Sequence, residues 1–167
     1  MRRILVLFSL AAMTAVGGMA RAPMAAASGT SYSFNLVTPN TAKAESGPFA
    51  GDTIKVRGAG SFDTATGTIV ASGAFTHIKA DGSVAAHGTW SSDGFMSFLA
   101  FGGPNPGIQG GYLQLTVTLF HKGIPVFTHV PMTVTCVVNS PGGYEEGTTV
   151  GDFIEKTGGT TLFHLNS

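Results

Sequence analysis

The sequence predicts an all-β protein, a single antiparallel meander closed as a barrel of roughly eight strands. Three observations lead to this prediction. Runs rich in Val, Ile, Phe and Thr either alternate with polar residues or stay apolar, as strands do. Short segments containing Gly, Asp, Asn or Pro bound these runs. Beyond residue 28 no stretch shows the 3.6-residue apolar period of an amphipathic helix. A β-sandwich is the alternative arrangement of the same strands.

The expected strands, taken in chain order, cover residues 31–38, 53–62, 68–78, 84–91, 94–101, 111–121, 125–138 and 160–166. Tight turns are expected at Asp81-Gly82, at residues 91–94 and at Gly123, where glycine supplies the backbone angles of a hairpin. We favour a barrel because closing the sheet removes exposed strand edges. Residues 101–111, with five glycines and two prolines, are expected to form a mouth or lid over one end, and residues 139–147 a second loop.

The first 27 residues have the features of a secretory signal peptide. A basic start is followed by an uncharged apolar run from Ile4 to Ala20 and by the small residues Ala25–Ala27. A transmembrane anchor is the alternative, although the run is barely long enough to span a bilayer. We therefore predict one mature domain over residues 28–167, secreted or periplasmic and free of the membrane after cleavage.

Charge and cysteine content narrow the classes of function. Removing Arg2, Arg3 and Arg21 leaves six basic residues against nine acidic ones, a net charge of −3 for the mature chain. The basic surface of a nucleic-acid-binding protein is therefore not expected. Cys136 is the only cysteine, so no intrachain disulfide can form. It falls on the apolar side of its strand, and we interpret it as a buried, inert thiol.

Residues 58–68, GAGSFDTATGT, could bind a phosphate or shape a strand and its turn. A dinucleotide site needs G-x-G-x-x-G between a strand and a helix, but Asp63 occupies the third glycine position and another strand follows. Gly58 and Gly60 share one face with Ile54, Val56 and Phe62. On that apolar face the glycines allow sharp coiling or leave room for a large neighbour. The stretch is therefore expected to be scaffold.

The same residues resemble a known family. Residues 58–68 are similar to the glycine-rich strand, turn and strand of the allene oxide cyclase and dirigent barrels, which carry a comparable G-x-G-x-F…A-x-G pattern. Those families are calycin-like eight-stranded barrels that bind apolar, oxygenated small molecules. The resemblance therefore implies such a cavity here, but it transfers no catalytic residue. The wider pattern FDTATG…GAFTH…GTW is similar to uncharacterised exported bacterial proteins.

The candidate ligand site is apolar and aromatic. His121 shares one strand face with several aliphatic residues, and aromatic residues surround the 101–111 loop in the sequence. His121 and Tyr112 are the candidates for a polar contact or a general acid or base. The alternative is ordinary core packing, since small barrels can be filled by side chains. The predicted ligand-binding residues are Trp90, Phe98, Phe101, Tyr112, Leu115, Val117 and His121.

Metal binding is a weaker interpretation. His77 and His87 flank the Asp81-Gly82 turn and would lie nearly opposite each other across a hairpin, where a third ligand could complete a Zn²⁺ or Cu²⁺ site. His121 and His129 flank the next turn in the same way. No H-x-H, H-E-x-x-H or C-x-x-C spacing supports such a site, so the sequence predicts no metal.

The sequence thus predicts an exported barrel that binds a small apolar or aromatic molecule. If the protein is an enzyme, we expect a cofactor-independent isomerase or cyclase. The first alternative is a non-enzymatic extracellular structural or adhesion module, and the second a metal-binding barrel. Each of these three functions is compatible with a homo-oligomer. A cavity under the 101–111 loop would favour ligand binding, whereas a barrel filled by side chains would argue against it.

Overall fold

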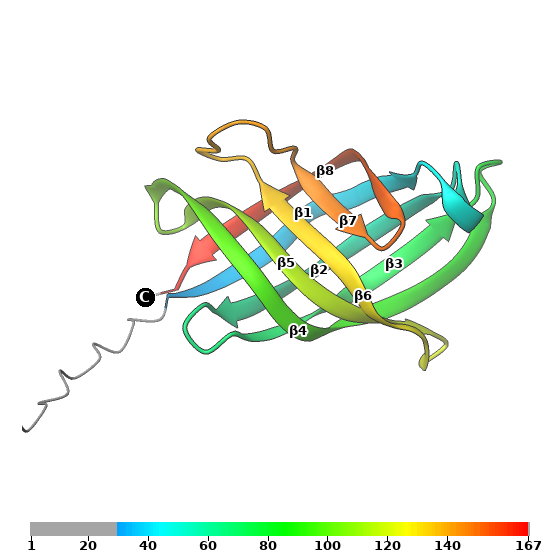
Figure 1. Cartoon of the computed structure of the whole chain (residues 1–167), viewed down its shortest axis with the longest axis horizontal. Helices are drawn as coiled ribbons and strands as arrows, with labels where there is room; N and C mark the ends of the chain where they lie inside the picture. The colour runs from blue at the N-terminus through cyan, green and yellow to red at the C-terminus, as the bar shows by residue number, and fades with distance from the viewer. Residues whose placement is uncertain (1–29, 167) are drawn as a thin grey trace, which may run out of the picture.

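The computed structural model describes residues 30–166, and the signal peptide predicted for residues 1–27 lies outside them. The described strands are β1 (Ser31–Ala44), β2 (Thr53–Asp63), β3 (Thr68–Ile78), β4 (Val84–Asn105), β5 (Ile108–His121), β6 (Ile124–Cys136), β7 (Gly147–Val150) and β8 (Phe153–Leu165). They form one antiparallel meander that closes as a barrel (Figure 1). This confirms the predicted fold class. A short 3₁₀ helix, η1 (Gly47–Phe49), links β1 to β2, and no helix within residues 30–166 could cross a membrane.

Strand β4 differs most from the prediction. The two strands expected over residues 84–91 and 94–101 are one continuous strand, and the position of the expected break is a bulge at Asp93. The carboxylate of Asp93 accepts hydrogen bonds from the Thr118 hydroxyl at 3.0 Å and from the His129 backbone N–H at 3.1 Å. These contacts to β5 and β6 hold Asp93 within the sheet. The predicted turn at residues 91–94 was therefore wrong.

Residues 101–111 do not form a lid. Strand β4 continues to Asn105 and β5 begins at Ile108, so the segment is the end of a hairpin. Its glycines allow close approach of neighbouring backbones, because a Cβ on Gly103 would overlap the carbonyl of Ile108. Two further differences are that β1 extends to Ala44 and that β7 was not predicted.

Aromatic rings fill the end of the barrel at which the described chain begins and ends. The ring of Phe98 lies 4.7 Å from that of Tyr32, 4.8 Å from that of Phe62 and 5.1 Å from that of Phe163, centroid to centroid. The two ends of the described chain meet beside this cluster, where the Asn166 N–H donates to the Ser31 carbonyl (Figure 1). We call this the aromatic end of the barrel.

Trp90 is buried in the barrel core, against Gly58 of β2 and Gly73 of β3. Its indole N–H donates to the Arg57 carbonyl at 3.0 Å, and the residue is only 2% exposed. Gly58 and Gly73 face each other in the β2–β3 register. A Cβ on Gly73 would lie 2.6 Å from the indole nitrogen. Gly58 and Gly73 therefore make room for the indole. This is one of the two roles that the sequence suggested for the glycines of residues 58–68.

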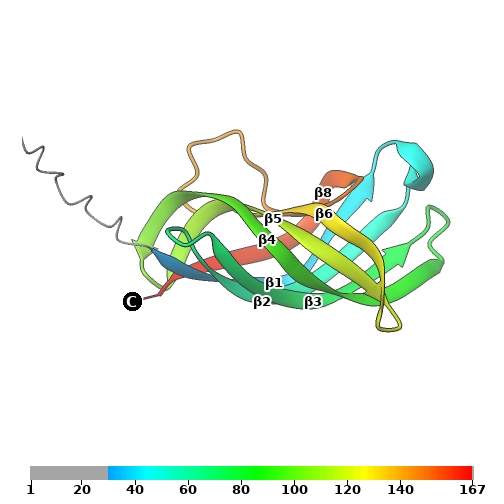
Figure 2. The ribbon, with the colours of Figure 1, turned by 60° about the horizontal axis from the view of Figure 1, so that its bottom comes forward.

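The sheet is incompletely paired at the other end of the barrel. Strand β6 pairs with β7 only from Met132 to Thr135, and the Pro131 carbonyl accepts the Gly151 N–H, so residues 124–130 of β6 pair on one side alone, with β5. Figure 2 shows η1 (cyan) and the β5–β6 turn (yellow-green) at this end, away from the C-terminus. We call it the open end.

Candidate ligand-binding site

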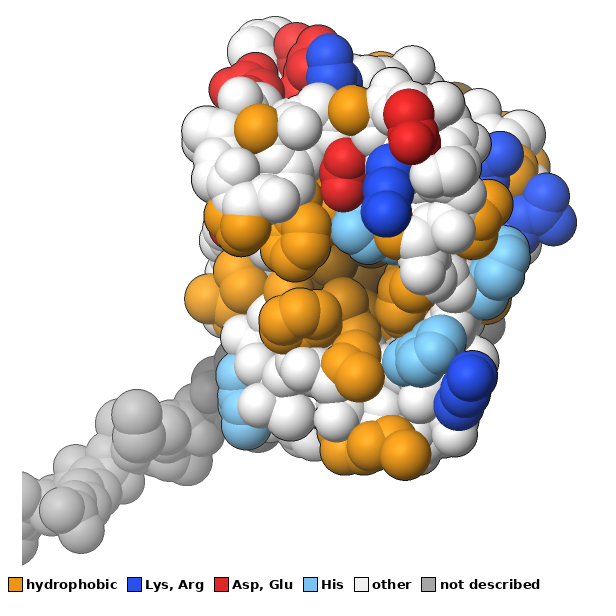
Figure 3. Space-filling view, turned by 90° about the vertical axis from the view of Figure 1, so that its right-hand side faces the viewer, with side chains coloured by type: hydrophobic (Ala, Val, Ile, Leu, Met, Phe, Trp, Pro, Cys, Tyr) orange, Lys and Arg blue, Asp and Glu red, His pale blue; other side chains and the backbone are white. Residues whose placement is uncertain are grey.

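A pocket of about 520 Å³ opens at the open end of the barrel. Figure 3 looks onto this end and shows hydrophobic side chains lining a central hollow, with histidine side chains beside it. The interior of the pocket is built from residues at the ends of several strands and from η1. The main apolar side chains of this wall are Phe49, Ile54, Phe75, Leu119, Val150 and Phe153.

The rim is formed by β6, and its shape follows from a bulge. Opposite β5, the β6 register skips from Val130 to Phe127, so two residues stand where regular pairing would place one. His129 lies at this bulge with φ of 55°, a left-handed conformation that side chains rarely adopt. Consecutive residues of β6, 126–131, consequently all line the pocket, although alternation in a regular strand would turn every second one away.

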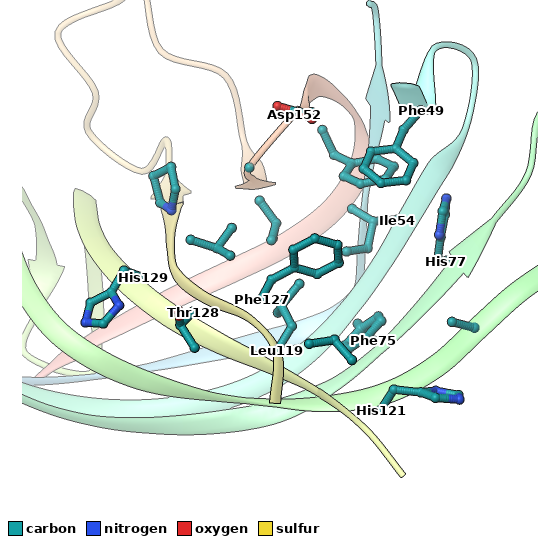
Figure 4. A pocket seen from close by; sticks show the side chains of 17 residues that line it. Phe49, Ile54, Phe75, His77, Leu119, His121, Phe127, Thr128, His129 and Asp152 are labelled. Carbon is teal, nitrogen blue, oxygen red and sulfur yellow. The ribbon is translucent and has the colours of Figure 1, made fainter. Parts of the chain in front are cut away.

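The rim is apolar as well as exposed. Val126 is 46% exposed and Phe127 is 53% exposed, and both line the pocket. Figure 4 shows Phe127 lying across the pocket from Phe49, with Ile54 and Leu119 around it. Large apolar side chains that remain exposed around a hollow favour contact with an apolar molecule.

His77 is the polar side chain that is tied most firmly to the wall of the pocket. Its Nε2 lies 2.7 Å from Asp52 Oδ2, and the other oxygen of Asp52 accepts the backbone N–H of Ala80 at 2.9 Å. The imidazole meets the rings of Phe49 and Phe153 edge-on, at centroid distances of 5.3 and 5.4 Å (Figure 4). Asp52 precedes β2 and therefore joins the η1 loop to the β3–β4 turn.

The predicted ligand-binding residues are spread along the barrel. His121 lines the pocket, and its Nδ1 lies 2.9 Å from the His87 carbonyl. The other six residues do not line it. Trp90, Leu115 and Val117 are buried in the core, and Phe98 belongs to the aromatic end. Phe101 and Tyr112 pack instead against Tyr144, at centroid distances of 4.7 and 5.4 Å.

The pocket lies at the opposite end of the barrel from the predicted mouth. Sequence reasoning missed Phe49, Phe127 and Phe153, because they come from three segments far apart in the chain. It considered His77 only as a metal ligand. His121 was selected because it alternates with apolar residues on one face of its strand, close to the strand end. The same signal could have selected His77.

The structure does not assemble the histidine pairs considered for metal binding. In the β3–β4 register His77 lies opposite Ala86 and His87 opposite Thr76, so the two imidazoles point to different faces of the sheet. The Nδ1 of His87 lies 3.2 Å from the Thr76 hydroxyl. Across residues 30–166, no group of three or more His, Cys, Asp or Glu side chains is arranged to hold a metal ion.

Cys136 is 1% exposed, which confirms the prediction that it is buried. Burial raises the pKa of its thiol above the ordinary value, so the reactive thiolate is disfavoured. The cysteine therefore contributes to core packing in β6 and lies away from the pocket.

Comparisons with protein-family models, with curated proteins and with solved structures found no match for this chain. The resemblance to the allene oxide cyclase and dirigent barrels therefore stays a prediction.

Proposed function

We propose that this protein binds a small apolar or aromatic molecule in the open end of its barrel. The observation that carries the proposal is the pocket itself, which has a volume of about 520 Å³ and a mainly apolar wall. Ligand sites in proteins commonly measure about 300–1,000 Å³ and combine an apolar wall with a few polar groups. His77, His121 and Asp152 are polar groups of this kind here.

The energetic argument rests on the exposed rim. Phe127 and Val126 expose apolar surface to water in the free protein. A ligand seated between them and the inner wall removes that surface from water, at about 25 cal/mol for each Å² of apolar area. The aromatic end is filled with packed rings, so it offers no second route through the barrel. A ligand would therefore enter and leave at the rim.

Two neighbouring residues of β4 provide a matched test. Ala86 lies opposite His77 in the β3–β4 register and lines the pocket, whereas Ala85 is exposed at a register shift and does not line it. Ala86→Trp would place an indole in the pocket, and Ala85→Trp would add the same side chain outside it. We expect a fluorescent apolar probe, N-phenyl-1-naphthylamine, to bind the unchanged protein. Ala86→Trp should weaken this binding at least about tenfold, or 1.4 kcal/mol.

Ala85→Trp should leave the dissociation constant of the probe unchanged, and circular dichroism should show that both variants fold. Absence of probe binding to the unchanged protein would contradict the proposal. Equal weakening by both substitutions would also contradict it, because the probe would then be responding to something other than the pocket.

A further inference from the structure

The His77–Asp52 contact determines which nitrogen of the neutral imidazole donates to the carboxylate. A neutral imidazole carries one N–H, and the nitrogen that faces a carboxylate is the one that donates. The Nε2 of His77 lies 2.7 Å from Asp52 Oδ2, so Nε2 carries the proton and Nδ1 keeps its lone pair. His77 therefore presents a basic nitrogen.

The Nδ1 of His77 is exposed, on a residue that lines the pocket. Within residues 30–166, Nδ1 of His77 has no hydrogen-bond partner. The same part of the chain contains no buried side-chain nitrogen or oxygen that lacks a partner. Nδ1 must therefore be reachable from outside, and His77 is one of the residues that line the pocket.

The surroundings of the His77 imidazole are mainly apolar, apart from Asp52. Phe49 and Phe153 flank the ring edge-on, and Ile54 and Ala86 lie opposite His77 on the two neighbouring strands. In such an apolar setting the attraction between the Asp52 carboxylate and an imidazolium is stronger than in water. The Ala80 N–H fixes the carboxylate in position, so little reorganisation is needed.

We propose that His77 is a general base of this pocket, positioned by Asp52, and that it moves a proton on a bound apolar substrate. This inference rests on the proposed binding function. The substrate class is an apolar molecule with a weakly acidic C–H beside a carbonyl or a double bond. His77 Nδ1 takes the proton, the C–H electron pair becomes part of a new double bond, and the shifted electrons accept the proton at another carbon. The net reaction is an isomerisation and needs no oxidant or reductant.

The other candidate acids and bases are less well arranged. His121 lines the pocket, but its Nδ1 bonds to a backbone carbonyl and no carboxylate contacts it in the described chain. Tyr112 packs against Tyr144 and its hydroxyl accepts the amide of Gln114, away from the pocket. Asp52 therefore distinguishes His77 from both.

The test uses 5-nitrobenzisoxazole, a small aromatic molecule whose isoxazole ring opens when a base removes the proton on C3, the carbon bonded to the ring nitrogen. The C–H electron pair forms a nitrile, the N–O bond breaks, and a coloured phenolate is released. We expect the protein to accelerate this reaction above an equal concentration of free imidazole. His77→Gln should lower kcat about 10²-fold, the usual contribution of a general base. Asp52→Asn should lower kcat in the same direction.

His87→Gln is the matched control, because His87 points to the outer face and contacts Thr76. It should leave kcat unchanged. KM and the affinity for N-phenyl-1-naphthylamine should change by less than about twofold in His77→Gln, which separates lost proton transfer from lost binding. A merely structural role for His77 would move folding stability and probe affinity instead.

Two results would overturn the assignment while leaving the binding proposal intact. One is a protein that binds N-phenyl-1-naphthylamine but reacts no faster than free imidazole. The other is a His77→Gln variant that keeps the rate, or a His87→Gln variant that loses it equally. If the fluorescent probe does not bind at all, the proposed function fails and this inference fails with it.

Discussion

Gly58→Ala tests why glycine is needed beneath Trp90. A Cβ on Gly58 would lie 2.6 Å from the carbonyl oxygen of Ser72 and 3.1 Å from Cε2 of the indole, and it would meet Cζ2 even more closely. The carbonyl belongs to the backbone of β3, which pairs with β2 along its whole length. Neither the strand nor the buried indole can give way without moving other parts of the core.

The expected loss of stability combines three effects. Overpacking a close-packed core costs about 1–3 kcal/mol. Displacing the indole endangers its hydrogen bond to Arg57, and an unpaired buried N–H costs about 1–3 kcal/mol. Alanine also restricts the unfolded chain, which returns about 0.4–1 kcal/mol. We therefore expect Gly58→Ala to lower the free energy of unfolding by about 2–4 kcal/mol.

Urea unfolding measures this change directly, because Trp90 is the only tryptophan in the sequence and reports its own surroundings by fluorescence. Gly94→Ala in β4 is the control. There a Cβ would lie 3.2 Å from the Thr116 hydroxyl, a side-chain atom rather than backbone. We expect this control to change stability by less than about 1 kcal/mol. A Gly58→Ala protein as stable as the unchanged one would refute the packing argument.

Three further outcomes are expected at other sites. Asn40→Ala should cost about 2–4 kcal/mol in urea unfolding, because Asn40 is 1% exposed and its amide oxygen accepts the hydroxyls of Thr148 and Thr161. Cys136 should react with Ellman's reagent only after denaturation, whereas rapid native reaction would contradict its burial. NMR titration should give Asp63 a pKa below its ordinary value, chiefly because the Thr66 backbone N–H donates to the carboxylate. The contribution of Asp63 to folding stability should therefore be complete above the ordinary pKa of an aspartate and disappear as the pH falls through the lowered pKa.

The sequence predicted strands and turns well where their conformation depends on residues that are close together in the chain. Residues 53–62 and 68–78 were predicted almost to the residue, since their alternation and the Asp63 turn between them depend on neighbours in the chain. The expected break in β4 failed for the opposite reason. Asp93-Gly94 has the chemistry of a turn, but the groups that keep Asp93 in the sheet come from Thr118 and His129, on later strands.

The position of the site depended on contacts that no local pattern contains. Alternation along β5 selected His121, which is among the residues that line the pocket. Which end of the barrel stays open is decided elsewhere, because Tyr32, Phe98 and Phe163 meet only when the barrel closes and then fill one end. The bulge that turns residues 126–131 toward the pocket depends on a left-handed His129, which carries no sequence signal comparable to a glycine.

The central claim is that an apolar molecule occupies the open end of the barrel. Two-dimensional amide NMR spectra recorded during titration with N-phenyl-1-naphthylamine test this claim most directly. Signals of Ile54, Leu119 and Phe153, which line the pocket, should shift as the probe is added, while those of Phe62 and Phe163 at the aromatic end should stay in place. Shifts confined to the aromatic end or to the outer faces of the strands, or a spectrum that does not change, would contradict the account.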